Sequence, residues 1–468
     1  MLDKQRCDPS LVPLVYASAP GSGLISTRME EARTQRTRTP AHWSESMSVL
    51  YDRISAVSNE QVVSPRPLRV AGLFAGVGGL ELGLRRAGLE TALLCEVWAP
   101  AQAVLTKQFP DIPLEPDVRH LKALPSDVDV VTAGFPCQDL SQAGRTAGIG
   151  GEQSGLVSHV FRLLNKHHPR WLVLENVRNM LVLDKGKAMF HLVNELEALG
   201  YSWAYRLVDS RFTGVPQRRQ RVLFVASLTE DPRDVLLAED AGEPDGTGLA
   251  TDAYGFYWTE GLRGLGWAQD AVPTIKGGSG LSIPSPPGIW IPSNPAGHRI
   301  VTPSITDAEQ LQGFDKDWTL TDATADKKSG RDRWKLVGNA VTVGVSEWLG
   351  RQLLDPGTYD ESEADRLSDS ARWPTAAWGG GGKRWRSYVS MWPERRGHTH
   401  LMDLVDRGGL TPLSHRAAAG FYSRTQKANL RFDEMFLVHM KEHVELTRPR
   451  VAVQGPAAAS VEQDSAER

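Results

Sequence analysis

Cysteine is scarce in this sequence of 468 residues, which contains only Cys7, Cys95 and Cys137. An odd, widely spaced set does not form a disulfide framework, and without a CxxC pair there is no sign of a thiolate metal site. Long apolar runs are also missing, so no segment is predicted to span a membrane. The first residues lack the pattern of a secretory signal. We therefore expect a soluble, cytoplasmic protein that binds no metal.

Positive charge is not in excess either, because 53 Lys and Arg residues face 56 Asp and Glu residues for a net charge of −3. Nucleic-acid-binding proteins are often basic overall, but a binding groove needs only a local positive field. Two stretches are locally basic, and a solvent-exposed face explains each stretch at least as well as a nucleic-acid-binding groove does. Their residues are Arg206, Arg211, Arg218, Arg219 and Arg221 in the first stretch and Arg331, Arg333 and Lys335 in the second.

Short apolar runs alternate with helical stretches from Leu68 to about Ser227. This alternation predicts an α/β fold, with a largely parallel sheet covered by helices on both faces. The predicted strands are Leu68–Ala75, Thr91–Val97, Val128–Ala133, Trp171–Glu175, Trp203–Val208 and Val222–Ala226. The predicted helices are Gly79–Ala87, Pro100–Phe109, Gly155–Lys166 and Lys187–Leu199.

Composition divides the chain into further segments, and no internal repeat is visible. The polar ends, residues 1–66 and 449–468, are expected to be disordered tails. The α/β domain covers 67–228 and resumes at 301–356, after a Gly- and Pro-rich, loop-rich insertion at 229–300. Residues 357–382 end in a glycine run and are predicted to be a linker, and 383–448 a small helical appendage.

A glycine-rich turn follows the first predicted strand, in the run Phe74-Ala75-Gly76-Val77-Gly78-Gly79. Such a turn lets the backbone approach a ligand closely. Glu96 ends the second strand, twenty residues after Gly76, where an acid binds ribose hydroxyls in doubly wound folds. Together they predict a nucleoside-type cofactor without separating NAD from S-adenosylmethionine. Asp117 is either a contact for an adenine amino group or a surface carboxylate.

Cys137 lies just past the strand Val128–Ala133, in the run Gly134-Phe135-Pro136-Cys137-Gln138-Asp139-Leu140-Ser141. Open α/β sheets place their ligand sites at such strand ends. The glycine-rich stretch that follows could act as a lid. Cys95 instead lies within an apolar run and is expected to be a buried, inert thiol. Cys137 is therefore the candidate nucleophile.

Two further strand ends carry polar groups. Glu175 in Glu175-Asn176-Val177 is a candidate acid or base, although a helix cap or a surface acid has the same appearance. The run from Gly214 to Arg221 contains arginines that could bind a phosphate or a pyrimidine oxygen, or form a solvated basic turn.

Taken in order, these fragments resemble the motif set of the DNA cytosine-C5 methyltransferases. They are FAGVGG, the Glu96 acid, GFPCQDLS, ENV, PQRRQR, LQGF and Val337-Gly338-Asn339-Ala340-Val341, over residues 68–356. The resemblance implies a Rossmann-like, S-adenosylmethionine-dependent methyltransferase fold, with 229–300 as the target-recognition region. It also implies methyl transfer to carbon 5 of a cytosine flipped out of a specific double-stranded DNA sequence.

The same resemblance assigns roles to single residues. Cys137 would add to C6 of the base, Glu175 would bind its N3/N4 edge and Arg221 its O2, while Arg219 would hold the catalytic loop or a phosphate. The implied cofactor site contains Phe74, Gly76, Gly78, Glu96, Asp117, Pro136, Asn339 and Val341. The implied DNA contacts are Gln138, Ser141 and Thr274.

One departure from the family pattern is Gly72, which stands where an acid usually opens the glycine motif. Two alternatives stay open: an RNA (tRNA) cytosine-C5 methyltransferase, and an inactive relative that holds DNA or cofactor. The recognition-type insertion argues against the first, and the intact Cys137, Glu175 and Arg221 argue against the second. By analogy we expect a monomer with a cognate restriction endonuclease, although an orphan or phage-defence enzyme is equally compatible.

Overall fold

A computed structural model describes residues 66–136, 155–277, 284–325, 330–362, 364–368 and 370–449. Cys137, Gln138 and Ser141 lie outside these ranges, as do the two predicted tails except for their inner residues Arg66 and Pro449. Among the described residues, no helix combines the length and apolarity needed to cross a membrane.

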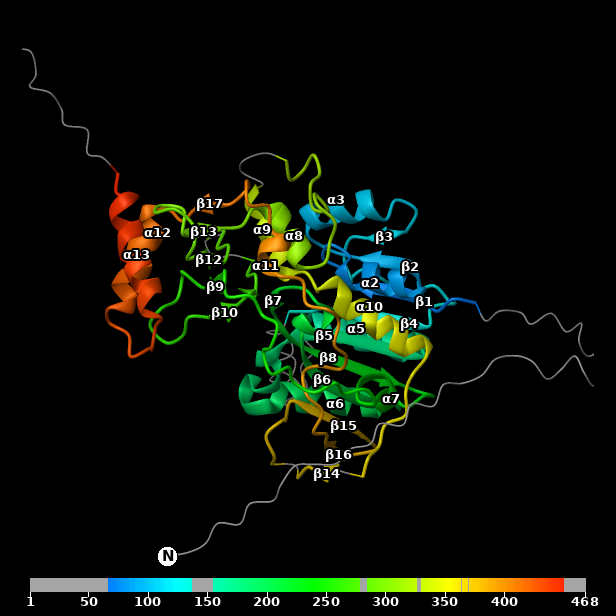
Figure 1. Ribbon diagram of the computed structural model, residues 1–468. Coiled ribbons are helices and arrows are strands. Elements are labelled where there is room, and N and C mark those ends of the chain that lie inside the picture. Colours follow the sequence, from blue (N-terminus) through cyan, green and yellow to red (C-terminus); the bar gives the residue numbers. More distant parts are fainter. Residues whose placement is uncertain are drawn as a thin grey trace, which may run out of the picture. The chain divides into compact units, whose positions relative to one another are not determined.

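A ten-stranded sheet forms the centre, in the order β14-β16-β15-β6-β8-β5-β4-β1-β2-β3 (Figure 1). The strands β1 to β5 pair in parallel, and β8 runs antiparallel to both β5 and β6. The six predicted strands are confirmed with small shifts at their ends. The bounds are β1 Arg69–Leu73, β2 Glu90–Cys95, β3 Leu114–Glu115, β4 Val130–Ala133, β5 Trp171–Val177, β6 Ser202–Asp209 and β8 Gln220–Ser227.

Helices cover the sheet, and the four predicted ones are confirmed. Their bounds are α2 Gly79–Ala87, α3 Ala99–Gln108, α5 Leu156–His167 and α6 Lys187–Ala198, followed by the short α7 Pro232–Leu236. The late helix α10 (Val343–Leu354) lies against α2 (Figure 1). There the Ser346 hydroxyl donates to the Gly79 carbonyl over 2.9 Å. The α/β domain is therefore built from two separate stretches of chain.

A second sheet of five strands has the order β10-β9-β12-β13-β17. Its bounds are β9 Tyr254–Phe256, β10 Ala268–Gln269, β12 Gly288–Trp290, β13 Ile300–Thr302 and β17 Thr411–Pro412. The helices α12 (His415–Thr425) and α13 (Glu434–Leu446) pack on it, and Phe421 and Phe436 join Phe256 in one apolar cluster. Residues 411–446 are therefore part of this second sheet and its helical layer, and the prediction of a separate helical appendage was wrong.

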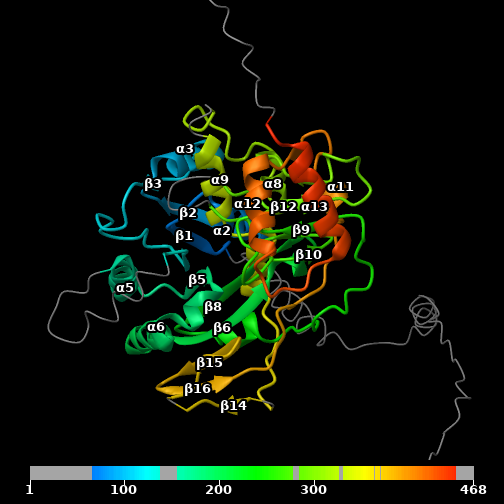
Figure 2. The ribbon, with the colours of Figure 1, turned by 90° about the vertical axis from the view of Figure 1, so that its left-hand side faces the viewer.

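The predicted linker was also wrong, because it contains strands. β14 (Asp365–Arg366), β15 (Ala376–Gly380) and β16 (Lys383–Arg386) extend the central sheet beyond β6. They lie together at one end of the sheet in both ribbon views (Figure 2). The glycine run forms the turn between β15 and β16, with Gly381 and Gly382 at positive φ. A tight hairpin and a flexible linker both favour glycine, so composition alone did not distinguish them.

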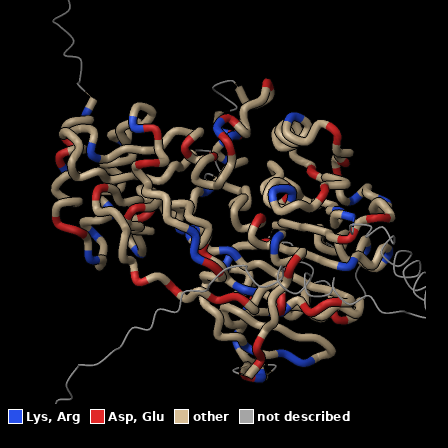
Figure 3. The backbone as a smooth tube through the Cα atoms, turned by 45° about the vertical axis from the view of Figure 1, so that its right-hand side comes forward, with Lys and Arg blue, Asp and Glu red and all other residues tan. Residues whose placement is uncertain are grey.

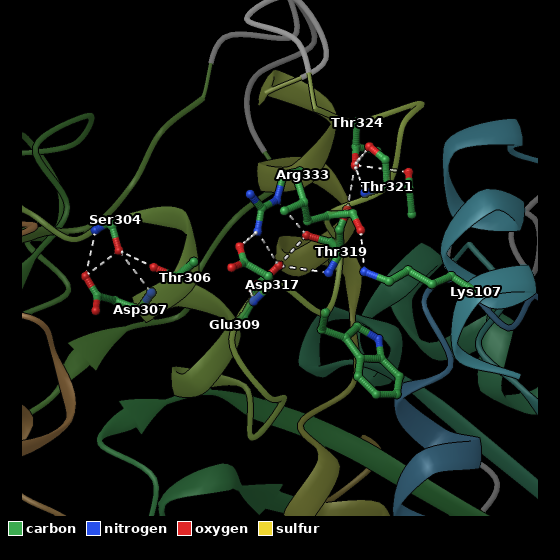
Figure 4. Close-up of polar contacts among 12 residues, drawn as sticks. Lys107, Ser304, Thr306, Asp307, Glu309, Asp317, Thr319, Thr321, Thr324 and Arg333 are labelled. Carbon is green, nitrogen blue, oxygen red and sulfur yellow. Dashed lines mark hydrogen bonds and ion pairs between the residues drawn. The ribbon is translucent and has the colours of Figure 1, made fainter.

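The described part of the segment between α8 (Ile305–Leu311) and α9 (Gly330–Asn339) is held by an ion pair of Arg333 with the buried Glu309 and by contacts around it (Figure 4). Arg333 Nη2 lies 2.9 Å from Glu309 Oε1 and 3.1 Å from Asp317 Oδ1. The Thr319 backbone N–H donates to the same Glu309 oxygen. On the α3 side, Lys107 Nζ donates to the Leu320 carbonyl over 2.8 Å. These contacts fix α9, whose last residue is the predicted cofactor contact Asn339.

The locally basic stretches are largely structural. Arg206 is fully buried and donates to the Ser390 carbonyl and to Asp240, and Arg333 is buried beside Glu309. Lys and Arg are interspersed with Asp and Glu along the backbone (Figure 3). A counted run of arginines therefore overestimates the positive charge that a ligand could reach.

Candidate active site

The carboxyl ends of β1, β2, β4 and β5 meet at one edge of the sheet, because these strands are parallel. That edge receives the glycine turn, Glu96, the residues leading to Cys137, and Glu175. Strand β8 runs the opposite way, so its first residues, Gln220 and Arg221, arrive at the same edge. The topology thus gathers most of the predicted site from fragments far apart in sequence.

The glycine turn and Glu96 are joined directly. The carboxylate of Glu96 accepts hydrogen bonds from the Gly76 N–H over 2.9 Å and from the Trp98 N–H over 2.8 Å. Phe74, Gly76 and Gly78 all have positive φ, between 56° and 79°. This backbone is strained for Phe74, and such strain concentrates where a loop must hold a ligand.

A cavity of about 230 Å³ opens beside this turn, lined by Phe74, Cys95, Glu96, Val97, Asp117, Val118, Arg119 and Leu156. Asp117 accepts hydrogen bonds from the backbone and side chain of Arg119, and these lower the pKa of its carboxyl to about 2. The cavity combines aromatic and aliphatic walls with two carboxylates. These acceptors and walls fit an adenosine group, because carboxylates accept hydrogen bonds from ribose hydroxyls and an amino group while the apolar walls cover the ring.

Cys95 is an unsuitable nucleophile. Burial raises the pKa of its thiol to about 12, and the nearby carboxylates of Glu96 and Asp117 add to the shift. The prediction of a buried Cys95 is confirmed, and a raised pKa disfavours the thiolate, which is the reactive form.

Glu175 and Arg221 form an ion pair across β5 and β8, with Arg221 Nε 2.9 Å from Glu175 Oε1. The side chains are 9% and 14% exposed, respectively. Burial lowers the pKa of Arg221, and Glu175 opposes that shift. Oε1 accepts no well-aligned hydrogen bond from any described residue. A buried carboxylate beside a guanidinium, with acceptor capacity left over, is suited to bind a polar ligand.

For Arg219 the structure bears on one of its two predicted roles, phosphate binding, because the catalytic loop of the other role lies outside the described residues. The Arg219 side chain is buried, and it donates to the carbonyls of Ile275 and Gly338 over 3.3 Å and of Ala340 over 2.6 Å. A phosphate cannot reach a guanidinium enclosed in this way. Arg219 therefore ties the segment at Ile275 to the end of α9.

Two residues missed by the motif analysis position this edge. The Asn176 amide donates to the Phe135 carbonyl over 3.0 Å, two residues before Cys137. Gln217 is fully buried and donates to the Leu311 carbonyl while accepting from the Ile275 N–H. Asn176 lies in the motif ENV and Gln217 in PQRRQR, next to charged residues to which the motif analysis assigned the roles.

The remaining predicted residues occupy varied positions. Val341 is buried with its carbonyl against the start of α2, where a methyl group on Gly79 would come within 2.6 Å of the oxygen. Asn339 is exposed at the end of α9, and Pro136 is exposed at the last described position before Cys137. Thr274 is half-buried, and its hydroxyl donates to the Arg218 carbonyl over 2.9 Å. That bond extends a two-stranded pairing of β7 (Gln217–Arg218) with β11 (Val272–Pro273).

Gly72 has a structural explanation. A Cβ at Gly72 would lie 2.3 Å from Oε1 of Glu81, whose carboxylate fills the adjacent space and accepts from the Thr132 hydroxyl. Burial raises the pKa of Glu81 to about 7. A carboxyl group is therefore present next to the first strand, supplied by α2 instead of by position 72.

Comparison with known proteins agrees with this geometry. Residues 68–245 match the C-5 cytosine-specific DNA methylase family. The type II methyltransferase M2.BsuMI of Bacillus subtilis is 46% identical over 383 residues, which cover 79% of this chain and 96% of that protein. The chain belongs to the C-5 cytosine-specific DNA methylases. The resemblance inferred from the order of the motifs is confirmed, as is the Rossmann-like methyltransferase fold.

Other relatives match over shorter stretches or at lower sequence identity. The type II methyltransferase M.BanI of Aneurinibacillus aneurinilyticus is 34% identical over 184 residues, 38% of this chain and 42% of that protein. The crystal structure of the S. pombe Dnmt2 methyltransferase aligns with a TM-score of 0.47 at 16% identity, covering 62% of this chain and 98% of the other. As a member of the family, the protein methylates carbon 5 of cytosine in DNA, and S-adenosylmethionine is the methyl donor that the family uses.

Proposed function

We propose that Cys137 is the nucleophile of this DNA methyltransferase and that Glu175 and Arg221 bind the target cytosine. The observation that carries the proposal is the buried Glu175–Arg221 ion pair, which lies at the same sheet edge as the residues that lead to Cys137. The Asn176 bond to Phe135 links the two fragments. The chain leading toward Cys137 and the residue Glu175 thus come from the adjacent strands β4 and β5, and Arg221 comes from β8, which pairs with β5.

The proposed chemistry is needed because C5 of cytosine is a weak nucleophile. The Cys137 thiolate adds through Sγ to C6, which makes the C5–C6 π electrons available at C5. Glu175 hydrogen-bonds the N3/N4 edge and Arg221 the O2, so that negative charge pushed into the ring is stabilised. After C5 has gained the methyl group, its proton leaves to water, the Sγ–C6 bond breaks, and the ring is restored. The base must leave the duplex to reach these groups.

The cavity beside the glycine turn is proposed to hold S-adenosylmethionine, which when bound supplies an electrophilic methyl group. Glu96 and Asp117 would accept hydrogen bonds from the nucleoside, and Phe74 would cover the adenine. Asn339 and Val341 would complete the site from the α9–α10 connection.

The biological role proposed is protection of DNA from a cognate restriction endonuclease by a monomeric enzyme. The support is the 46% identity to M2.BsuMI, a type II methyltransferase. The test is bisulfite sequencing of DNA and RNA from a host that expresses the protein, with Cys137→Ala and Cys7→Ala variants. We expect C5-methylcytosine in DNA at one sequence context for the wild type and for Cys7→Ala, and none for Cys137→Ala. Methylation confined to RNA would contradict the DNA substrate, and an active Cys137→Ala would contradict the nucleophile.

A further inference from the structure

Three metal-ligating side chains meet away from the active site: Asp270, His398 and His400. Asp270 lies in the turn between β10 and β11, and its side chain is fully buried. The two histidines come from the segment just before α11 (Leu401–Leu404). The Asp270 Oδ2 lies 3.0 Å from His398 Nε2 and 2.6 Å from His400 Nδ1.

The backbone holds these side chains in place from both ends. The Thr399 N–H donates to the Gly214 carbonyl over 2.9 Å, and the Arg396 N–H donates to the Phe212 carbonyl over 3.0 Å. Residues two apart in an extended chain point to the same side, and both flanking imidazoles accordingly reach Asp270. The segment is anchored on the α/β domain before it reaches the recognition region.

Asp270 is equally constrained. Its Oδ1 accepts from the Leu401 N–H over 2.8 Å and its Oδ2 from the Ala250 N–H over 2.9 Å. Its own N–H donates to the Ala253 carbonyl. Backbone donors that orient a ligating carboxylate are the usual outer shell of a metal site.

We propose that Asp270, His398 and His400 bind one divalent transition-metal ion of the zinc class, with a fourth position open to water. All three ligand atoms lie within 4.8 Å of one another. Zinc bonds of about 2.0–2.1 Å in a tetrahedron require ligand atoms about 3.3 Å apart, so small side-chain rotations would suffice. Two imidazoles and one carboxylate favour zinc over magnesium or calcium, which prefer oxygen ligands alone.

The ion would act as a structural clamp. Asp270 lies two residues before β11, which pairs with β7 beside Arg219, and the histidines belong to the segment fixed on Gly214. Joining the two would hold the recognition region against the α/β domain. None of the three ligands belongs to the proposed catalytic or cofactor sites, so the ion would not take part in methyl transfer.

The test uses the full chain, stripped with a chelator, desalted and titrated with Zn²⁺ by calorimetry and with Co²⁺ by absorption. We expect one ion per chain, a rise in Tm on addition of Zn²⁺, and a cobalt spectrum without a sulfur charge-transfer band, which excludes Cys7 and Cys137 as ligands. His400→Gln, at a side chain 44% exposed, should fold and weaken binding at least about tenfold. The double variant His398→Gln/His400→Gln should abolish it, and His298→Gln, at an exposed histidine outside the cluster, should match the wild type.

Two results would overturn the proposal. One is the absence of Zn²⁺ binding by the stripped wild type, which would leave Asp270 as a carboxylate hydrogen-bonded to two histidines. The other is binding that His400→Gln and the double variant leave unchanged. Because binding and Tm are measured without DNA or methyl donor, the outcome is independent of the proposed catalytic roles.

Discussion

Arg221 Nε lies 2.9 Å from Glu175 Oε1, across the antiparallel pair of β5 and β8. Removing one partner of a buried ion pair leaves the other charge uncompensated, so both residues depend on this contact. Glu175→Gln keeps the shape of the side chain and removes its charge. We expect it to lower kcat about 100- to 1,000-fold, as the loss of one transition-state hydrogen bond to charge does elsewhere.

Single-turnover methyl transfer to DNA measures this effect, and circular dichroism shows whether the variant is folded. Glu115→Gln is the matched control, because Glu115 is exposed on β3. A Glu175→Gln enzyme with the wild-type rate would remove Glu175 from the mechanism.

Glu96→Gln should weaken cofactor binding. The two carboxylate oxygens of Glu96 accept one hydrogen bond each, from the backbone N–H groups of Gly76 and Trp98. A glutamine side chain has only one oxygen, so one of these N–H groups would lose its acceptor. We expect affinity for S-adenosylmethionine to fall about tenfold or more, corresponding to about 1.4 kcal/mol, with a smaller change in kcat at saturation. Calorimetry with S-adenosylmethionine measures this, and Glu90→Gln, exposed at the other end of β2, should bind normally. Equal affinity of Glu96→Gln and wild type would place the cofactor elsewhere.

Arg219→Lys should destabilise the fold. A lysine cannot reach the carbonyls of Ile275, Gly338 and Ala340 together, and buried acceptors left without partners cost about 1–3 kcal/mol each. We expect a loss of about 2–4 kcal/mol in the free energy of unfolding, which urea denaturation measures. The half-buried neighbour Arg218, changed to lysine, should lose less than about 1 kcal/mol. If both variants were equally stable, Arg219 would not tie these segments together.

Stability should fall with rising pH because of Glu81. Its pKa is raised from 4.5 to about 7 by burial, so the folded state binds this proton more tightly than the unfolded state. The contribution is complete below about pH 4.5 and is lost as pH rises through 7, up to about 3 kcal/mol in total. Glu81→Gln should therefore gain stability relative to wild type between pH 5 and pH 8.

Urea denaturation at both pH values checks this difference, with Glu90→Gln as an exposed control. An equal effect of Glu81→Gln at pH 5 and pH 8 would contradict the raised pKa.

Motif order predicted the sheet edge well, because Glu96, Glu175 and Arg221 lie at strand ends that local patterns reveal. It could not predict the partners of Arg219, because a buried arginine and a phosphate-binding arginine look the same in a sequence motif. It also misassigned residues 357–448. The pairing of β15 with β6 and of β17 with β13 joins segments more than a hundred residues apart, and nothing in a short window of sequence encodes such distant pairing.

The packing of α10 on α2 sets an order for the synthesis of the protein. Leu84 of α2 shares an apolar cluster with Trp348 and Leu349 of α10, and these emerge from the ribosome more than 250 residues later. Until then the nascent α/β domain carries an uncovered apolar face. Chains that stop before Val343 would keep that face exposed and be ready substrates for chaperones and proteases.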